Sequence, residues 1–207
     1  MRVFSMHIGD QEGPGIDDDE AVDVNTVLEL SQKAGPHPWV DNWSVKTVRL
    51  FGPGSAGDLL VWSLGSLVSS RVCECLKLQT LPGEGVRYLP VDVRMRRRVL
   101  ERYYWLYFEK RFDLVALDHC TFLPESTDHD LRDLRRVVFD ATRLLGHNLF
   151  EVGLGKYVSE SVFEALTFLR LRGVEFDEQV VYDPKTGTMT PSKPKASSSK
   201  STAKRSR

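Results

Sequence analysis

A short unit that occurs twice, with its copies 90 residues apart, constrains the fold of this chain more than any other feature of its sequence. Residues 68–76 read Val-Ser-Ser-Arg-Val-Cys-Glu-Cys-Leu and residues 158–166 read Val-Ser-Glu-Ser-Val-Phe-Glu-Ala-Leu. A Gly-Val-x-aromatic segment follows each copy, at 85–88 and 173–176. We interpret the unit as a serine-capped helix that lies on a sheet, followed by a glycine that leads into a strand. Any capped helix before a strand gives a similar pattern, so a true repeat requires both helices to pack on related sheet faces.

Strand-like segments surround the two helices. We expect helices over 69–79 and 160–171, the second with an apolar face that includes Val162, Phe163, Leu166, Leu169 and, as a further candidate, Phe168, and with Gly173 as its C-terminal stop. Alternating apolar residues and aromatic density predict strands near 45–50, 86–93, 102–108, 114–117, 134–139, 148–152 and 174–182. The sequence therefore predicts an α+β fold, mainly antiparallel sheet with two short packed helices and two similar halves, in one domain over residues 1–183.

The net charge of −1 is the sum of two unlike parts. Residues 184–207 contain no acidic residue and seven of the 28 basic residues, which leaves 21 basic and 29 acidic residues, a net of −8, in residues 1–183. The terminal segment is rich in Ser, Lys, Pro, Thr and Gly and has almost nothing apolar, so it cannot bury enough surface to offset its ordering entropy. We expect an acidic folded body and a disordered basic tail over 184–207.

Composition also excludes several classes of protein. The longest apolar stretch, residues 59–70, is about 12 residues long, whereas a membrane helix needs about 20. The first ten residues lack the apolar core and cleavage site of a signal peptide. The chain has three cysteines, and Cys73 and Cys75 are separated by a single residue, which favours reduced thiols. We expect a cytoplasmic protein with no membrane partner.

No residue pattern predicts a metal site. On a helix, Cys73 and Cys75 point about 200° apart, and zinc sites have at least two residues between paired cysteines. We interpret the cluster of His119, Cys120 and His129 as turn residues. Residues 128–139 begin with the aspartate spacing of a calcium loop but lack its glycine at the sixth position and its glutamate at the twelfth. We therefore expect no metal and no cofactor.

Catalytic patterns are equally weak. His119 and Cys120 are adjacent, so on a strand their side chains point to opposite faces and cannot act as base and nucleophile. The glycine-rich segment 52–57 lacks the Gly-Lys-Ser/Thr of a phosphate-binding loop and is followed by Asp58. The sequence predicts that this protein is not an enzyme.

The repeated unit and its neighbours carry a family resemblance. In their order, residues 67–70, 85–91, 104–106, 114–118, 148–152, 158–160 and 173–176 resemble the bacterial immunity-protein family numbered eleven, a former domain of unknown function whose members are often encoded beside polymorphic toxins. The resemblance covers about residues 50–180. It implies an immunity protein that binds and neutralises a cognate toxin and has no catalysis of its own. The acidic segment 10–29, the arginine-rich segment and the basic tail have no counterpart in that resemblance.

Two features could contact such a partner. The acidic run Asp17, Asp18, Asp19 and Glu20 could cover a basic toxin surface and accelerate association, although such runs are commonly solvated loops. Trp39 and Trp43 could be interface anchors, although tryptophans near a strand are more often core residues. These six residues are the predicted partner-binding residues.

Nucleic-acid binding is the alternative function. Arg94, Arg96, Arg97 and Arg98, together with the basic tail, could neutralise phosphates. The aromatic residues over 103–108 could stack on bases. Against this alternative, their spacing is that of a central strand in a sheet core and the folded body is acidic.

Overall fold

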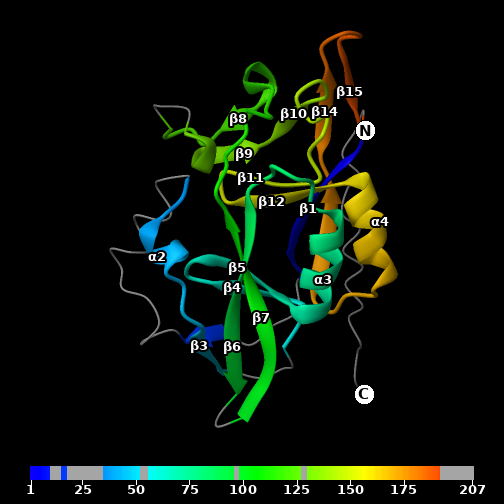
Figure 1. Ribbon diagram of the computed structural model, residues 1–207. Helices are drawn as coiled ribbons and strands as arrows, with labels where there is room; N and C mark the ends of the chain where they lie inside the picture. Colours follow the sequence, from blue (N-terminus) through cyan, green and yellow to red (C-terminus); the bar gives the residue numbers. More distant parts are fainter. Residues whose placement is uncertain (10–14, 18–34, 52–55, 96–97, 127–129, 192–207) are drawn as a thin grey trace, which may run out of the picture.

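The computed structural model describes residues 1–9, 15–17, 35–51, 56–95, 98–126 and 130–191 (Figure 1). Four sheets and three α-helices make up this part of the chain, and most strand pairs are antiparallel. The strand order is β2-β3-β6-β7-β5-β4 in the six-stranded sheet and β11-β12-β1-β13 in the four-stranded sheet. The predicted α+β class is therefore confirmed.

The repeat found in the sequence organises the two largest sheets. A hairpin of β4 (Leu59–Trp62) and β5 (Gly65–Ser69) leads into α3 (Ser70–Gln79) and then into β6 (Val86–Met95). A second hairpin of β11 (Leu149–Val152) and β12 (Gly155–Ser159) leads into α4 (Glu160–Phe168) and then into β13 (Val174–Glu178). The hairpins are also 90 residues apart, so the repeat begins nine residues earlier than the sequence pattern indicated.

In the two halves, one corresponding strand comes from a different part of the chain. In the first half, β7 (Arg98–Phe108) lies between β5 and β6; in the second half, β1 (Val3–Ile8) lies between β12 and β13. Val68 pairs with Tyr104 as Val158 pairs with Phe4. The sheet order β4-β5-β7-β6 thus corresponds to β11-β12-β1-β13, and the N-terminal strand completes a sheet built mainly from the C-terminal third of the chain.

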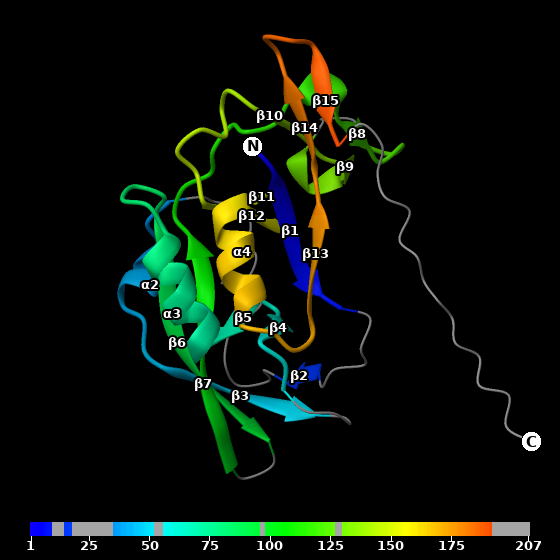
Figure 2. The same cartoon turned by 90° about the vertical axis from the view of Figure 1, so that its right-hand side faces the viewer.

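The helices of the two halves pack against each other (Figure 2). The largest apolar cluster lies between them and the two sheets, and includes Val72 and Leu76 from α3 and their counterparts Val162 and Leu166 from α4, all at most 1% exposed. In Figure 1 the helices lie side by side on the right, whereas the two hairpins extend to the left. An approximate two-fold axis relates the two halves. The helices lie near one end of this axis and the hairpin turns near the other.

Polar side chains at the start of each hairpin connect the halves. Asp58, before β4, is 1% exposed and accepts hydrogen bonds from the backbone N–H of Arg172 in the other half and from Ser69 Oγ, both at 2.7 Å. Asn148, before β11, occupies the corresponding position, accepts a hydrogen bond from Ser159 Oγ at 2.9 Å and donates one to the Gln79 carbonyl at 2.8 Å. Ser69 and Ser159 precede the helices as predicted, but neither side chain makes a capping hydrogen bond, because each bonds the residue before its hairpin instead.

Smaller elements accompany the two large sheets. Two strands of the six-stranded sheet itself, β2 (Gly15–Asp17) and β3 (Lys46–Phe51), surround a second apolar cluster together with α2 (Pro38–Asp41). Beside the four-stranded sheet lie β8 (Thr121–Phe122), β9 (Leu134–Arg136), β10 (Val138–Asp140), β14 (Val180–Asp183) and β15 (Thr188–Thr190), with the short 3-10 helices Leu117–His119 and Leu131–Asp133. A third apolar cluster fills this interface.

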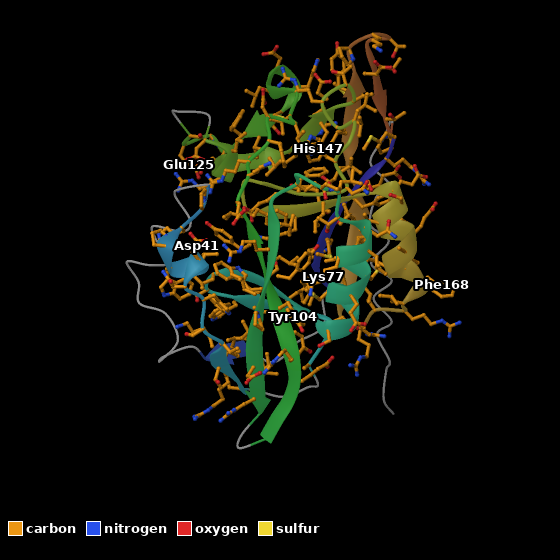
Figure 3. All side chains as sticks on the ribbon, in the orientation of Figure 1. Asp41, Lys77, Tyr104, Glu125, His147 and Phe168 are labelled. Carbon is orange, nitrogen blue, oxygen red and sulfur yellow. The ribbon has the colours of Figure 1, made fainter. Side chains whose placement is uncertain are left out.

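Several predicted boundaries were wrong. Residues 114–117 form no strand: Leu114 and Val115 are buried, but only an isolated bridge joins Val115 to Phe139. Helix α4 ends at Phe168 rather than 171, and the Phe168 side chain is 89% exposed and extends away from the body (Figure 3), so it is not part of the apolar face.

The last predicted strand and the start of the tail also differ from the prediction. Residues 174–182 form two strands, β13 and β14, which belong to different sheets. Strand β15 lies inside the segment that was predicted as tail, because Asp183 bonds the turn residues Lys185 and Thr186 and Gly187 adopts a φ of +68°. The folded body therefore continues to at least Thr190, and residues 192–207 lie outside the described part.

Candidate functional site

A pocket of about 170 Å³ lies where the hairpin turns of the two halves approach each other. The corresponding turn segments 63–65 and 153–154 both line it, together with residues 105–108 of β7. Pairing between β5 and β7 ends at Trp105, so residues 106–108 have no residue of β5 opposite them on this side. The charged lining residues are Arg111, Asp130, Arg132, Glu151 and Lys156.

Lys156 is the most buried cation of the pocket. Its side chain is 11% exposed, and its Nζ lies 2.9 Å from Glu151 Oε1 and 3.2 Å from the carbonyl oxygen of Leu154. A Cβ on Gly65, in the other half, would lie 3.8 Å from the same Nζ, so the turn of the first half reaches the ammonium group. The corresponding positions of the first half carry Val61 and Ser66, so the repeated unit does not require this ion pair.

Two arginines lie at the exposed side of the pocket. Arg132 donates to Asp130 Oδ2 from its Nε at 2.9 Å and from Nη2 at 2.5 Å, and this guanidinium lowers the pKa of Asp130 to about 2. Arg111 is exposed and follows β7 by three residues. Among the described residues, three cations and two carboxylates line the pocket, and each carboxylate is paired with one of the cations.

Trp39 and Trp43 are part of a cluster that contains all four tryptophans of the chain. Their ring centroids are 4.9 Å apart, and Trp43 lies 5.5 Å from Trp105 and 6.4 Å from Trp62. Both rings are half-buried, and Lys46 Nζ lies over them at 5.2 and 5.9 Å. The structure thus brings the two predicted anchors together as part of the second apolar cluster.

The predicted acidic run has one member in the described structure. Asp17 is the last residue of β2, and its Cα pairs with that of Arg49 on β3. Its neighbour Ile16 packs on the cluster that contains Trp39 and Trp43. The other three members, Asp18, Asp19 and Glu20, lie outside the described residues.

A second acidic surface, which the sequence analysis did not single out, lies on β13. Glu175, Asp177 and Glu178 are all exposed, and we call them the acidic edge. Strand β13 is the last strand of its sheet, so its outer side carries no hydrogen-bonded strand among the residues described. His7 Nε2 lies 3.6 Å from Asp177 Oδ2 and 4.0 Å from Glu175 Oε2. The alternation of Val174 and Phe176 with acidic residues is the signal that could have revealed this edge.

The residues predicted to serve nucleic-acid binding separate into two environments. Arg94 is exposed near the end of the long β6–β7 hairpin, and Arg98 begins β7; Arg96 and Arg97 lie outside the described residues. The aromatic residues that follow are largely in the core, with Tyr103, Trp105, Tyr107 and Phe108 at most 6% exposed. Rings buried in this way cannot stack on bases.

At each of the three thiols burial is the largest effect on the pKa, and it outweighs the opposing effects of Lys77 on Cys73 and of Arg136 on Cys120. Cys73 is buried on α3, Cys75 is half-buried on the same helix, and burial raises the pKa of both. Burial also raises the pKa of Cys120, although the backbone of Val138 hydrogen-bonds its sulfur and opposes the shift. Within the described ranges no three His, Cys, Asp or Glu residues group as metal ligands, and no helix is long and apolar enough to span a membrane.

No family model matches the sequence, and no curated protein matches it significantly.

Proposed function

We propose that this protein is an immunity protein, which binds a cognate protein toxin and neutralises it by covering the surface that the toxin needs for its activity. The acidic edge is the observation that carries the proposal. Side-chain exposures of 57% for Glu175 and 72% for Asp177 leave both carboxylates accessible to a basic partner on an unpaired sheet edge. Opposite charges across an interface accelerate association and select the partner.

Two further observations support a binding role. Most of the sequence segments that resemble the immunity-protein family lie in the repeated unit or in the strand β7 of its first sheet, whereas residues 114–118 lie outside it, so the resemblance is not confined to one loop. Asp17, the first member of the acidic run, ends β2 at the edge of the six-stranded sheet, so a second sheet edge carries an acidic residue. A standard interface buries about 800 Å² on each partner, an area that such an edge and its surroundings can supply.

The burial of the aromatic residues favours this proposal over nucleic-acid binding. A single-strand binder combines a basic groove with accessible aromatic rings. Here four of the aromatic residues proposed for stacking have at most 6% of their surface exposed. The remaining basic residues near the hairpin end supply charge without a stacking surface.

Co-expression with the toxin encoded beside the gene tests the proposal. The wild-type protein is expected to restore growth, and Glu175→Lys/Asp177→Lys/Glu178→Lys is expected to lose the rescue because it places like charges against a basic surface. A triple variant with the same charge change at exposed acids elsewhere, Glu74→Lys/Asp118→Lys/Glu125→Lys, is the matched control and should still rescue.

The acidic run is tested in the same assay. Replacing Asp17, Asp18, Asp19 and Glu20 together by Lys should weaken the rescue. Full rescue by both this variant and the β13 triple variant would contradict the acidic-surface mechanism, and absence of rescue by the wild-type protein would contradict the immunity function itself.

A further inference from the structure

We propose that the toxin adds an extended segment rich in Lys and Arg to the outer side of β13, the side opposite β1, and is held there as a further strand of the four-stranded sheet. This binding mode rests on the immunity function proposed above and specifies how the partner is bound. A segment that joins a sheet edge gains affinity from main-chain hydrogen bonds and specificity from its side chains.

Every second residue of β13 directs its backbone groups away from β1. The Gln179 N–H, directly after β13, donates to the Val3 carbonyl oxygen at 2.8 Å. In an antiparallel pair, positions bonded to the neighbouring strand alternate with positions whose N–H and C=O point outward. The register between β1 and β13 therefore turns the backbone groups of Val174, Phe176 and Glu178 to the outer side. In the described part of the chain, no strand pairs with them there.

The corresponding side of the first sheet is covered. Strand β6 matches β13 at an offset of 88 residues, so Pro90 occupies the position of Glu178. The indole Nε1 of Trp43 donates to the Pro90 carbonyl oxygen at 3.0 Å. Arg87 Nη2 donates to the carbonyl oxygen of Val40, in α2, at 3.3 Å. The first half thus uses its own chain, at α2 and the residues after it, to cover the part of β6 that matches β13.

Strand pairing on the outer side begins at nearly the same position in both halves. Strand β3 pairs in parallel with β6 from Val91, and β10 pairs in parallel with β14 from Val180, which matches the next residue of β6. In both halves the five residues before this pairing have no strand on their outer side among the described residues. An extended segment as long as β13, which has five residues, therefore finds in the second half a place that α2 and Trp43 cover in the first.

Acidic side chains on both faces of this edge define the partner. Glu175 and Asp177 are exposed on one face, and Glu178 lies on the opposite face, because side chains alternate along a strand. On that second face, the hydrogen bond to Glu160 raises the pKa of Arg2, and the charge of Glu178 adds to this increase. An added strand meets a carboxylate whichever way its side chains alternate, so Lys or Arg at successive positions complements both faces.

The variants Glu178→Pro and Glu178→Gln separate strand addition from charge attraction. Both remove the same charge, but only proline removes the outward N–H and places a ring where the added strand would lie. Proline is tolerated in an edge strand where the N–H faces solvent, and urea unfolding should show a cooperative transition for both variants. In calorimetric titrations with the purified toxin encoded beside the gene, Glu178→Pro should bind at least about tenfold more weakly than Glu178→Gln. Equal affinities would overturn strand addition and leave the immunity function standing.

Amide exchange of the wild-type protein, followed by NMR with and without the toxin, is a second readout that needs no variant. In the free protein the amides of Glu175 and Asp177, which face β1, should exchange slowly and those of Val174, Phe176 and Glu178 should exchange fast. In the complex the three outward amides should slow by at least about tenfold. Outward amides that are already slow in the free protein, or toxin binding that leaves their exchange unchanged, would overturn strand addition alone. Absence of toxin binding would overturn the immunity function together with it.

Discussion

Replacement of Asp58 by Asn should destabilise the fold by about 3 kcal/mol, although the side chain barely changes in size. The carboxylate accepts hydrogen bonds from Ser69 Oγ, from Arg71 Nε at 2.7 Å, from Arg71 Nη2 and from the backbone N–H of Arg172. Asn can still accept the bond from Ser69, as Asn148 does from Ser159 in the other half. Its amide NH₂, however, would face the N–H groups of Arg71 and Arg172.

The magnitude follows from these contacts. At least two hydrogen bonds to a charged acceptor are lost, and such bonds contribute about 1.5–3 kcal/mol each. The Arg71 side chain is 41% exposed and can regain hydration, which lowers its share of the loss. The sum of about 3 kcal/mol corresponds to a fall in Tm of roughly 6–12 °C for a domain of this size.

The effect of Asp58 should also depend on pH. Burial alone raises the pKa of Asp58, but the hydrogen bonds from Arg71, from the Arg172 backbone and from Ser69 outweigh it, so the folded-state pKa lies below the usual value of 3.8. A carboxylate with a lowered pKa stabilises the fold above its unfolded pKa and loses this contribution as pH falls through the folded pKa. The stability difference between wild type and Asp58→Asn should therefore be constant from about pH 5 to 8 and should narrow below about pH 4.

Urea unfolding followed by tryptophan fluorescence measures this difference. Asp177→Asn is the matched control: its carboxylate is 72% exposed, so its removal should cost less than about 0.5 kcal/mol. If Asp58→Asn proved no more destabilising than the control, or if the difference were as large at pH 3 as at pH 7, the role assigned to Asp58 would be wrong.

Three further predictions follow from individual contacts. Gly153→Ala should destabilise the protein by about 2 kcal/mol more than Gly146→Ala, measured by urea unfolding, because both glycines have positive φ but only a Cβ on Gly153 would collide with the Leu131 carbonyl; equal losses would contradict this close approach. The three thiols should react with a thiol reagent at pH 8 at least tenfold more slowly in the folded protein than in urea, since burial raises their pKa; a fast-reacting thiol in the folded state would contradict it. Truncation after Pro191 should leave Tm within about 1 °C, and the full-length protein should show no strongly salt-dependent DNA binding; such binding that vanishes on truncation would support the nucleic-acid alternative.

The repeat was detectable in the sequence because it combines local signals, namely a serine, a helical apolar spacing and a glycine before a strand. The sequence did not reveal that β1 occupies in the second half the position that β7 occupies in the first. Nothing in the composition of Val3–Ile8 specifies which strands this segment pairs with. The predicted strand over 114–117 failed for a related reason: its apolar residues are buried by tertiary packing without a ladder of hydrogen bonds.

In the candidate site, too, contacts between residues close in sequence could be predicted, whereas contacts between distant residues could not. Trp39 and Trp43 could be selected from the sequence as candidate site residues because of their residue type. Their contact could be expected because they lie close together in the chain. Glu151 and Lys156 flank a Gly-Leu turn, a spacing that could have indicated a cross-strand ion pair. Asp58, by contrast, is connected to Arg172 across 114 residues, and no local pattern predicts such a contact.

Titration of the purified toxin with this protein tests the proposed mechanism most directly. Neutralisation by occlusion requires toxin activity to fall linearly with added protein and to reach its minimum at a fixed molar ratio, independent of incubation time once binding is complete. Progressive loss of toxin activity at a small fraction of one molar equivalent would show turnover and would contradict the proposal that the protein acts by binding alone.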